Sequence, residues 1–309
     1  MSDRLFIFGY GFSAAAFAAR MIARGIPVAA TCRSAEKAER LRAAGIEPHL
    51  FDGTAAPSAD RGAADRGAAD REAAERGAAL DAALAAATML LSSVPPDGEG
   101  DPVLRGAEPA IRAGAPYRWI GYLSTTGVYG DRDGGWVDET SALEPTGPRG
   151  ARRVEAERAW AALSECGPVM RFRLAGIYGP GRSALDTVRQ GRARRIVKPG
   201  QVFSRIHVED IAAALEASTD RPDPGAAYNL CDDEAAPPQE VIAHACDLLG
   251  VAPPPEIPFE AAELSDMARS FYRDNKRVRN DRIKRELGVR LAYPTYREGL
   301  AAQLAAEGA

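Results

Sequence analysis

The most informative stretch of the chain is Gly9-Tyr10-Gly11-Phe12-Ser13-Ala14, which stands between an apolar run, Leu5–Phe8, and a helical pattern over Ser13–Arg24. The first glycine permits a tight turn, and the second lets a phosphate group approach the backbone. Ala14 supplies the small side chain that the helix and strand need where they touch. Backbone N–H groups and the helix dipole then face the phosphates. The succession predicts a dinucleotide-binding unit, and a tight turn without a ligand is the alternative.

The same alternation of strand and helix patterns continues along the chain. Strands separated by helices form a parallel sheet covered on both faces, and right-handed crossovers make that sheet doubly wound. The expected fold class is α/β, a Rossmann-type doubly wound parallel sheet with a small C-terminal substrate lobe. Further strands are predicted over Val28–Cys32, His49–Phe51, Met89–Val94, Trp119–Leu123, Val169–Arg173 and Tyr228–Cys231, and further helices over Ala35–Ala43, Leu80–Ala87, Gln239–Leu249 and Tyr296–Ala305.

Composition suggests where the chain divides. The predicted Rossmann domain comprises residues 1–174, with residues 208–232 returning to it, and the lobe comprises residues 175–207 and 233–309. Residues 59–78 repeat a unit close to Ala-Asp-Arg-Gly-Ala. A five-residue period turns each unit about 140° further around a helix, so no single face stays apolar. This segment is predicted to be a low-complexity, solvated insertion, and a functional charged arm is the alternative.

Charge and cysteine usage exclude several function classes. The formal net charge of -4 gives no basic field for nucleic acid or an anionic membrane. No apolar run reaches the ~20 residues of a membrane span, and no signal peptide is evident. The four cysteines, Cys32, Cys166, Cys231 and Cys246, form no metal-binding spacing. A reduced, cytoplasmic chain without a structural metal is expected.

The end of the second strand, Thr31-Cys32-Arg33-Ser34, favours NADP over NAD. NAD enzymes usually carry a carboxylate here for the ribose hydroxyls. Arg33 would instead attract a 2′-phosphate, with the Ser34 hydroxyl as a further donor. One charge-assisted contact contributes roughly 1.5–3 kcal/mol, or about a ten- to hundred-fold preference. The alternative is that Arg33 points into solvent.

Two further loops are candidates for cofactor contacts. Asp52, after the third strand, can reach the adenine edge, and Val94-Pro95-Pro96, after the fourth, can line the far side of the cofactor. Both are equally compatible with ordinary loop chemistry, because Asp and Pro often end strands. Together with Gly9, Gly11, Phe12, Ser13, Ala14, Arg33 and Ser34, they make up the predicted cofactor site.

Four ordered stretches follow the glycine loop: Leu123-Ser124-Thr125-Thr126-Gly127-Val128-Tyr129-Gly130, Gly176-Ile177-Tyr178-Gly179-Pro180-Gly181, Arg205-Ile206-His207-Val208-Glu209-Asp210-Ile211-Ala212 and Tyr228-Asn229-Leu230-Cys231-Asp232-Asp233. These stretches resemble those of extended short-chain dehydrogenase/reductases, and the chain ending, residues 277–300, is most similar to the atypical NAD(P)-dependent epimerase/dehydratase branch called YeeZ-like. The resemblance covers nearly the whole chain except the repeat. It implies a nicotinamide cofactor and a homodimer that pairs through two helices of the Rossmann part.

The resemblance also implies a catalytic Ser/Thr, Tyr and Lys, and two of these three residues are replaced here. Thr125 takes the Ser/Thr position, Arg149 stands where Tyr is expected, and Arg153 stands where Lys is expected. Arginine stays charged and cannot shuttle a proton. Arg153 can still donate to the nicotinamide ribose. Arg149 can bind an anion or polarise a carbonyl group, but it cannot be the usual acid.

Replacement groups are few. Tyr129 is a candidate substitute acid, with core packing as the alternative. His207 is expected to order its strand-to-helix junction with Asp210, with a catalytic role as the alternative. Arg182 and Arg205 are candidate substrate-binding residues that, with Arg149 and Arg153, can surround an anion, and surface solvation is the alternative for each.

The sequence therefore predicts an NADP-dependent oxidoreductase or epimerase/dehydratase-like enzyme with atypical catalysis, acting on a small metabolite that is a candidate anion. An NAD(P)-binding redox sensor or regulatory protein without turnover is the alternative. Small-molecule binding is expected, with neither nucleic acid nor membrane as a partner.

Overall fold

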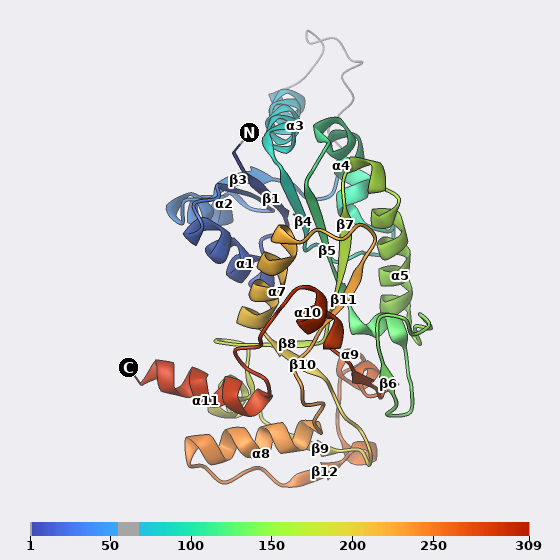
Figure 1. Ribbon diagram of the computed structural model, residues 1–309. Helices are drawn as coiled ribbons and strands as arrows, with labels where there is room; N and C mark the ends of the chain where they lie inside the picture. Colours follow the sequence, from blue (N-terminus) through green and yellow to red (C-terminus); the bar gives the residue numbers. More distant parts are fainter. Residues whose placement is uncertain (1, 55–67, 309) are drawn as a thin grey trace. The chain divides into compact units, whose positions relative to one another are not determined.

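The structure is a computed structural model that describes residues 2–54 and 68–308 (Figure 1). The chain forms two compact units. Unit 1 consists of Met1–Ser124, Arg152–Arg171 and Ser218–Ala226, and unit 2 consists of Thr125–Ala151, Phe172–Ala217 and Ala227–Ala309. The predicted division at residues 174, 207 and 232 stays a prediction.

A seven-stranded sheet of the Rossmann type confirms the predicted fold class. Its order is β3-β2-β1-β4-β5-β7-β11, and Leu5 of β1 pairs in parallel with Val28 on one side and Met89 on the other. The order therefore reverses between β1 and β4, which is where open sheets of this class bind ligands. The strands are β1 (Leu5–Phe8), β2 (Val28–Cys32), β3 (Glu47–Leu50), β4 (Met89–Ser92), β5 (Trp119–Thr125), β7 (Val169–Leu174) and β11 (Ala227–Leu230).

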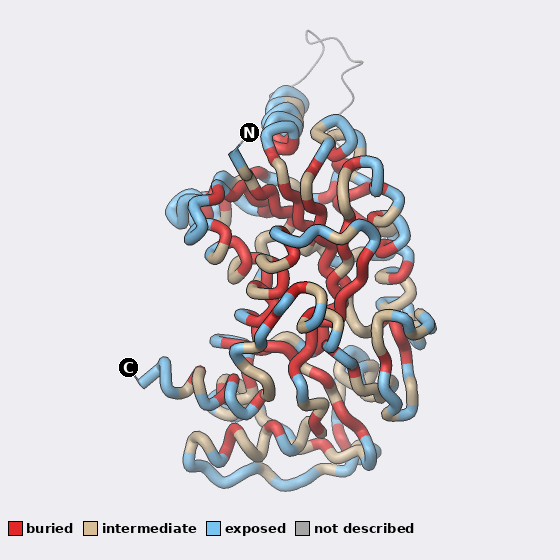
Figure 2. The backbone as a smooth tube through the Cα atoms, viewed as in Figure 1, coloured by how far each residue is buried: buried red, intermediate tan, exposed pale blue. Residues whose placement is uncertain are grey.

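The central strands form where apolar residues run without alternation. All residues of β1, β2 and β4 are buried, as parallel strands covered on both faces require (Figure 2). The bounds of β1, β2 and α2 are as predicted, whereas β3 is Glu47–Leu50 instead of His49–Phe51, because the β2 register pairs Ala29 with Glu47. The other predicted strands differ by one to a few residues at their ends.

Among the helices of unit 1, α2 and α4 begin at side-chain caps, those of Ser34 and Asp101. Asp101 accepts hydrogen bonds from the backbone N–H groups of Val103 and Leu104, and its other oxygen accepts one from Trp160 Nε1 at 2.9 Å. This buried carboxylate therefore fixes the start of one helix against the next. The helices are α1 (Phe12–Ala23), α2 (Ala35–Ala43), α3 (Ala68–Ala86), α4 (Pro102–Gly114) and the larger part of α5 (Pro148–Ala161).

The predicted boundary between the repeat and the helix that follows it was wrong. The helix predicted to begin at Leu80 begins at Ala68, so the last part of the repeat is helical. Alanine is the best helix former, and an ion pair four residues apart, Glu72 to Arg76 at 2.8 Å, supports the exposed turns. A helix anchored by the buried Leu80 and Leu84 can extend without an apolar face. Residues 59–67 lie outside the described residues.

Unit 2 is built from short elements around a separate apolar cluster. That cluster includes Tyr178, Leu185, Val241, Tyr296 and Leu300. Three parallel two-stranded pairs, β8 with β10, β9 with β12 and β6 with β13, lie in this unit. The elements are β6 (Trp136–Val137), β8 (Gly176–Tyr178), α6 (Ala184–Arg189), β9 (Arg195–Val197), β10 (Arg205–His207), α7 (Val208–Asp220, its end in unit 1), α8 (Pro238–Leu249), β12 (Glu256–Pro258), α9 (Asp266–Phe271), β13 (Arg277–Val278), α10 (Asp281–Glu286) and α11 (Tyr296–Glu307), with 3₁₀ turns η2 (Thr126–Tyr129), η3 (Ser164–Cys166, in unit 1) and η4 (Phe259–Ala261).

The described residues offer no candidate for a membrane span or for a metal site. None of their helices combines the length and the apolar character that crossing a membrane demands. No group of three His, Cys, Asp or Glu side chains in the same residues is placed to hold a metal ion. All four cysteines are free and buried.

Candidate functional site

The glycine loop joins the ends of three neighbouring strands in unit 1. Gly9 has a φ of +81°, and a Cβ atom there would lie 2.7 Å from Val94 Cγ2 at the end of β4. Its N–H donates to Thr31 Oγ1, on β2, at 2.8 Å. A side chain at position 9 would therefore be both strained and in collision. Glycine is required here by the close approach of β4.

Gly11 leaves space where a ligand would approach. It is the N-cap residue of α1, with extended backbone and no side-chain cap. A Cβ atom on Gly11 would meet no atom of the described chain within 4 Å. Ser13 and Ala14 are buried against the sheet, so the helix starts with its N-terminal end beside this space. An uncapped N-terminus of a twelve-residue helix beside open space fits the pyrophosphate of a dinucleotide.

The end of β2 carries a basic group that sequence reasoning missed. Arg33 and Ser34 are exposed, and Ser34 Oγ caps α2 by accepting from the N–H of Lys37 at 3.3 Å. The Ser34 hydroxyl keeps its own proton to donate. Lys37 Nζ donates to the carbonyl of Tyr10 in the glycine loop. The available signal was its position in the first turn of α2, four residues after Arg33.

The two other loops predicted for the cofactor also lie in unit 1. Asp52 Oδ1 accepts from Thr54 N at 2.9 Å and Thr54 Oγ1 at 2.6 Å, and these bonds hold the pKa of Asp52 below its usual value. Val94 touches the glycine loop as described above, whereas Pro95 is exposed and Pro96 is half-buried. The contact of Val94 with Gly9 places one end of the Val94-Pro95-Pro96 loop beside the predicted pyrophosphate position. Contacts of these residues with a cofactor stay predictions.

Arg153 is held at the carboxyl end of β5 in unit 1. Its Nη1 donates to the carbonyl of Leu123 and, at 3.1 Å, to Tyr122 Oη. The guanidinium carbon lies 5.7 Å from the centre of the Tyr122 ring. One turn later on α5, the buried Glu157 accepts from Ser124 Oγ at 2.6 Å. The residue at the predicted Lys position is therefore oriented by the strand that also carries the predicted Ser/Thr.

Thr125 and Arg149 lie in unit 2. Thr125 Oγ1 accepts from the N–H of Gly127 at 3.2 Å, which leaves its hydroxyl proton available to a ligand. A Cβ atom on Gly150 would lie 2.7 Å from the carbonyl oxygen of Gly127, so the start of α5 packs closely on this turn. The exposed Arg149 guanidinium stacks over the Phe271 ring at 5.6 Å. Unit 2 therefore brings the predicted Ser/Thr and Tyr positions to one turn.

Tyr129 is part of the core. Its side chain is fully buried, its hydroxyl donates to Asn229 Oδ1 at 2.7 Å, and it accepts from Arg173 Nη1 at 2.8 Å. Burial raises the pKa of Tyr129 to about 12. A phenol with both neighbours in place and a raised pKa is a poor proton donor near neutral pH. The contacts favour the core-packing alternative over the catalytic one.

His207 orders the start of α7 through a different bond from the one expected. Its Nδ1 accepts from the backbone N–H of Glu209 at 3.2 Å, and its ring packs against Tyr178 and Tyr293. Asp210 instead accepts from the N–H groups of Ala292 and Tyr293 at 2.7 and 3.1 Å. Burial lowers the pKa of His207 to about 4. These contacts favour the structural role.

Arg182 and Arg205 line one cavity of about 490 Å³ in unit 2. Arg182 is exposed, whereas Arg205 is half-buried and donates to the carbonyls of Phe203 and Ala236 at 2.8 and 3.1 Å. Sequence reasoning did not identify the other residues of this cavity, because helices, loops and a strand from separate parts of the sequence contribute them. Among them are Arg192, Thr187 and Tyr296.

Known proteins resemble this chain at three levels of similarity. A functionally unknown conserved protein from Silicibacter pomeroyi DSS is 50% identical, with a TM-score of 0.85 and 100% of both chains covered. Protein YeeZ of Escherichia coli K12 is 30% identical over 177 residues, 56% of this chain and 58% of YeeZ. A 3-diazoavenalumate denitrifying reductase from a Streptomyces species is 28% identical over 179 residues, 54% of each chain. The chain thus spans little more than half the length of these two curated relatives.

Solved structures of lower identity share the fold. At 12–24% identity and TM-scores of 0.68–0.73 they include NAD-dependent epimerases and dehydratases, and several hold NAD. No family model matches the chain.

Proposed function

Because the chain belongs to the extended short-chain dehydrogenase/reductases, we propose that it is an NADP(H)-dependent oxidoreductase or epimerase/dehydratase-like enzyme that acts on a small anionic metabolite. A bound nicotinamide would supply reversible hydride transfer. The observation that carries the proposal is the uncapped start of α1 beside the open space at Gly11.

The preference for NADP is supported by the groups at the end of β2. Arg33 and Lys37 provide two positive charges within one turn, and the Ser34 hydroxyl has a proton to donate. The position that would hold a ribose-binding carboxylate is occupied by Arg33 instead. A 2′-phosphate would gain charge-assisted hydrogen bonds here, whereas NADH would gain little.

The side chains at the predicted catalytic positions can orient a substrate and polarise its carbonyl group. The side chain at position 149 cannot exchange a proton with the substrate, because it is an arginine. The Thr125 hydroxyl can donate its proton to a substrate oxygen, because the bond from the N–H of Gly127 uses only a lone pair of Thr125 Oγ1. Arg149 can bind a carboxylate or polarise a carbonyl group, because its charge is permanent. Arg153 can donate to a ribose hydroxyl with the hydrogens that Leu123 and Tyr122 leave over. In this proposal solvent water replaces the missing tyrosine as proton source.

The same replacement favours a second candidate function. Losing a positioned acid or base typically costs about 10²–10⁴-fold in rate. A chain that keeps the dinucleotide site but has arginine at both the Tyr and Lys positions can act as an NAD(P)-binding sensor without turnover.

Titration of the purified protein with NADPH and NADH, followed by nicotinamide fluorescence, tests the proposal. We expect NADPH to bind more tightly, and Arg33→Ala to weaken NADPH binding about tenfold. Arg71→Ala, which removes an exposed charge on α3, is the matched control and should change nothing. Oxidation of bound NADPH by added carbonyl compounds then separates the enzyme from the sensor. Absence of binding by either nucleotide would overturn both candidate functions.

A further inference from the structure

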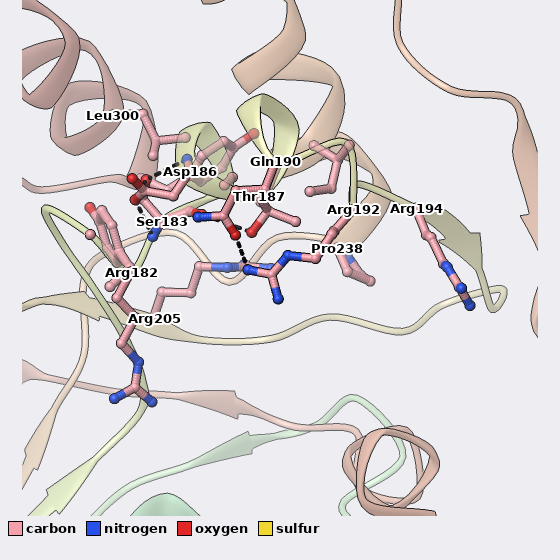
Figure 3. Close-up of a pocket in the computed structure, with 16 residues that line it drawn as sticks. Arg182, Ser183, Asp186, Thr187, Gln190, Arg192, Arg194, Arg205, Pro238 and Leu300 are labelled. Carbon is pink, nitrogen blue, oxygen red and sulfur yellow. Dashed lines mark hydrogen bonds between the residues drawn. The ribbon is translucent and has the colours of Figure 1, made fainter. Parts of the chain in front are cut away.

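The cavity that contains Arg182 and Arg205 has a strongly one-sided charge. It is lined by four arginines, Arg182, Arg192, Arg194 and Arg205, and its lining contains a single carboxylate, that of Asp186 (Figure 3). Asp186 Oδ2 already accepts from Ser183 N at 2.8 Å and from Ser183 Oγ at 2.6 Å, as part of the capping box of α6. In the lining as the structure describes it, Asp186 is therefore the single carboxylate beside four guanidinium groups.

The arginines differ in how they face the cavity. Arg192 extends back toward Gln190 at the end of α6 and donates to its Oε1 (Figure 3). Arg194 points away from these residues, and it donates to the carbonyl of Glu263 at 2.7 Å (Figure 3). Arg182 and Arg192 are exposed, whereas Arg205 is half-buried. Arg194 is exposed as well but is turned away, so within the lining that the structure describes Arg182 and Arg192 form a basic rim, and Arg205 lies deeper.

A polar group deep in the same cavity lacks a hydrogen-bond partner. Tyr296 lines the cavity and is only 1% exposed, yet its hydroxyl has no partner among the described residues. The Arg205 guanidinium lies 5.9 Å from the centre of its ring. An unpartnered buried hydroxyl is unfavourable, because it has lost the hydrogen bond that it makes with water in the unfolded chain. A ligand oxygen accepting from Tyr296 would remove that cost.

Besides the polar side chains of Ser183, Thr187 and Gln190, the lining has an apolar part. It comes from three helices, with Ala184 on α6, Pro238, Val241 and Ile242 on α8, and Leu300 on α11. A volume of about 490 Å³ is in the range of small-molecule sites. Fully hydrated inorganic ions gain nothing from such walls, whereas a molecule with an apolar body does. The walls therefore select an amphipathic anion.

We propose that this cavity binds an organic anion, a carboxylate or phosphate ester with an apolar body. Its anionic group is bound by Arg182 and Arg192 at the rim, its body packs on Val241, Ile242 and Leu300, and a second oxygen accepts from Tyr296. Arg182 and Arg205 are the predicted substrate-binding residues, so the bound anion would be the substrate of the proposed enzyme. In that respect the inference rests on the proposed function. The binding step itself requires no nicotinamide.

Calorimetric titration of the full chain with phenyl phosphate tests the site, with inorganic phosphate and benzyl alcohol as comparison ligands. We expect phenyl phosphate to bind, inorganic phosphate to bind at least tenfold more weakly, and benzyl alcohol not to bind. Arg182→Ala and Arg192→Ala should each weaken phenyl phosphate binding about tenfold. Arg290→Ala, which removes an exposed charge outside the cavity lining, should leave it unchanged.

Tyr296→Phe is the most selective variant. The hydroxyl has no partner to lose, so the melting temperature should not fall. Binding of 4-hydroxyphenyl phosphate, whose phenolic oxygen can accept from Tyr296, should fall several-fold in this variant. Equal binding by all arginine variants and Arg290→Ala, or tighter binding of inorganic phosphate than of phenyl phosphate, would overturn the inference.

NADPH titration of the same variants separates this inference from the proposed function. Phenyl phosphate binding with the expected variant pattern but without NADPH binding would refute the proposed function and leave the anion site standing. NADPH binding without phenyl phosphate binding would refute the anion site alone.

Discussion

Lys37 Nζ donates a hydrogen bond to the backbone carbonyl of Tyr10 and lies 5.9 Å from the centre of the Tyr10 ring. The bond joins α2 to the glycine loop across 27 residues of sequence. This bond places the positive charge of Lys37 beside the glycine loop of the predicted cofactor site. Lys37 belongs to α2, the helix that Ser34 caps. A lysine at this place has two consequences, support of the loop and attraction of a phosphate.

Lys37→Met separates these two consequences, because it keeps the aliphatic stem and removes the charge. We expect NADPH affinity to fall about tenfold and NADH affinity to stay within about twofold, since only NADPH carries the 2′-phosphate. Fluorescence titration with both nucleotides measures this. An equal loss for the two nucleotides would mean that Lys37 acts only by holding the loop.

Gly9 and Gly11 should respond differently to alanine. Gly9→Ala introduces a Cβ at a φ of +81° and 2.7 Å from Val94, so we expect a loss of about 2 kcal/mol or more in unfolding free energy. Gly11→Ala meets open space at an extended φ, so stability should change by less than about 1 kcal/mol, while NADPH affinity falls because the methyl group occupies the pyrophosphate position. Urea unfolding and fluorescence titration measure both. Unchanged NADPH binding by Gly11→Ala would contradict the cofactor site.

Tyr129→Phe tests the core network of unit 2. Removing the hydroxyl leaves Asn229 Oδ1 and Arg173 Nη1 each short of one buried hydrogen bond. We expect the unfolding free energy to fall by about 1–3 kcal/mol, as for other buried partners left unsatisfied. NADPH oxidation by the folded variant should remain within about twofold of the parent rate. A drop of a hundredfold or more at unchanged stability would restore Tyr129 as the acid.

His207 should make stability depend on pH. Its folded pKa is lowered to about 4 by burial, below the ordinary value of 6.5, so the unfolded chain binds the extra proton first. The contribution is fully present above pH 6.5 and is lost as the pH falls from about 6.5 toward 4. Protonation also removes the acceptor that Glu209 N–H uses. In His207→Asn, whose amide oxygen can accept in place of Nδ1, urea unfolding between pH 4 and 7 should show a shallower slope. An unchanged slope would assign the pH dependence to other groups.

The double variant Arg149→Tyr with Arg153→Lys restores the residue types that the family resemblance implies. If the proposed enzyme is limited by the missing acid, NADPH oxidation should rise by about 10²-fold or more. Single-turnover absorbance of bound NADPH measures the rate, and a melting curve checks that the loss of the Arg153 bonds to Tyr122 and Leu123 has not unfolded unit 1. No oxidation by parent or variant with any carbonyl compound would favour the sensor.

Much of unit 1 was predictable, because its signals are local. The apolar runs of β1 and β2 predict that these strands are buried throughout. The glycine at position 9 predicts the turn, because the turn requires a positive φ. The start of α3 was not predictable from periodicity, since alanine propensity alone extends that helix to Ala68. His207 was correctly expected to order the start of α7, but its hydrogen-bond partner was predicted wrongly. Glu209 and Asp210 are adjacent in sequence, and only the path of the backbone shows which of them bonds to His207.

The strand–loop–helix at residues 5–24 and the order of elements in a doubly wound sheet follow from the amino-acid sequence, and the family resemblance predicts that Arg149 and Arg153 stand where a Tyr and a Lys are usual. These depend on residue type and on neighbours a few positions away. Other contacts are visible only in the tertiary structure. Lys37 donates to the carbonyl of Tyr10, and Tyr129 donates to Asn229, a hundred residues later in the chain. Arginines near α6 line the same cavity as Tyr296. Such contacts depend on how distant segments pack, and no local pattern of polarity encodes which of them will meet.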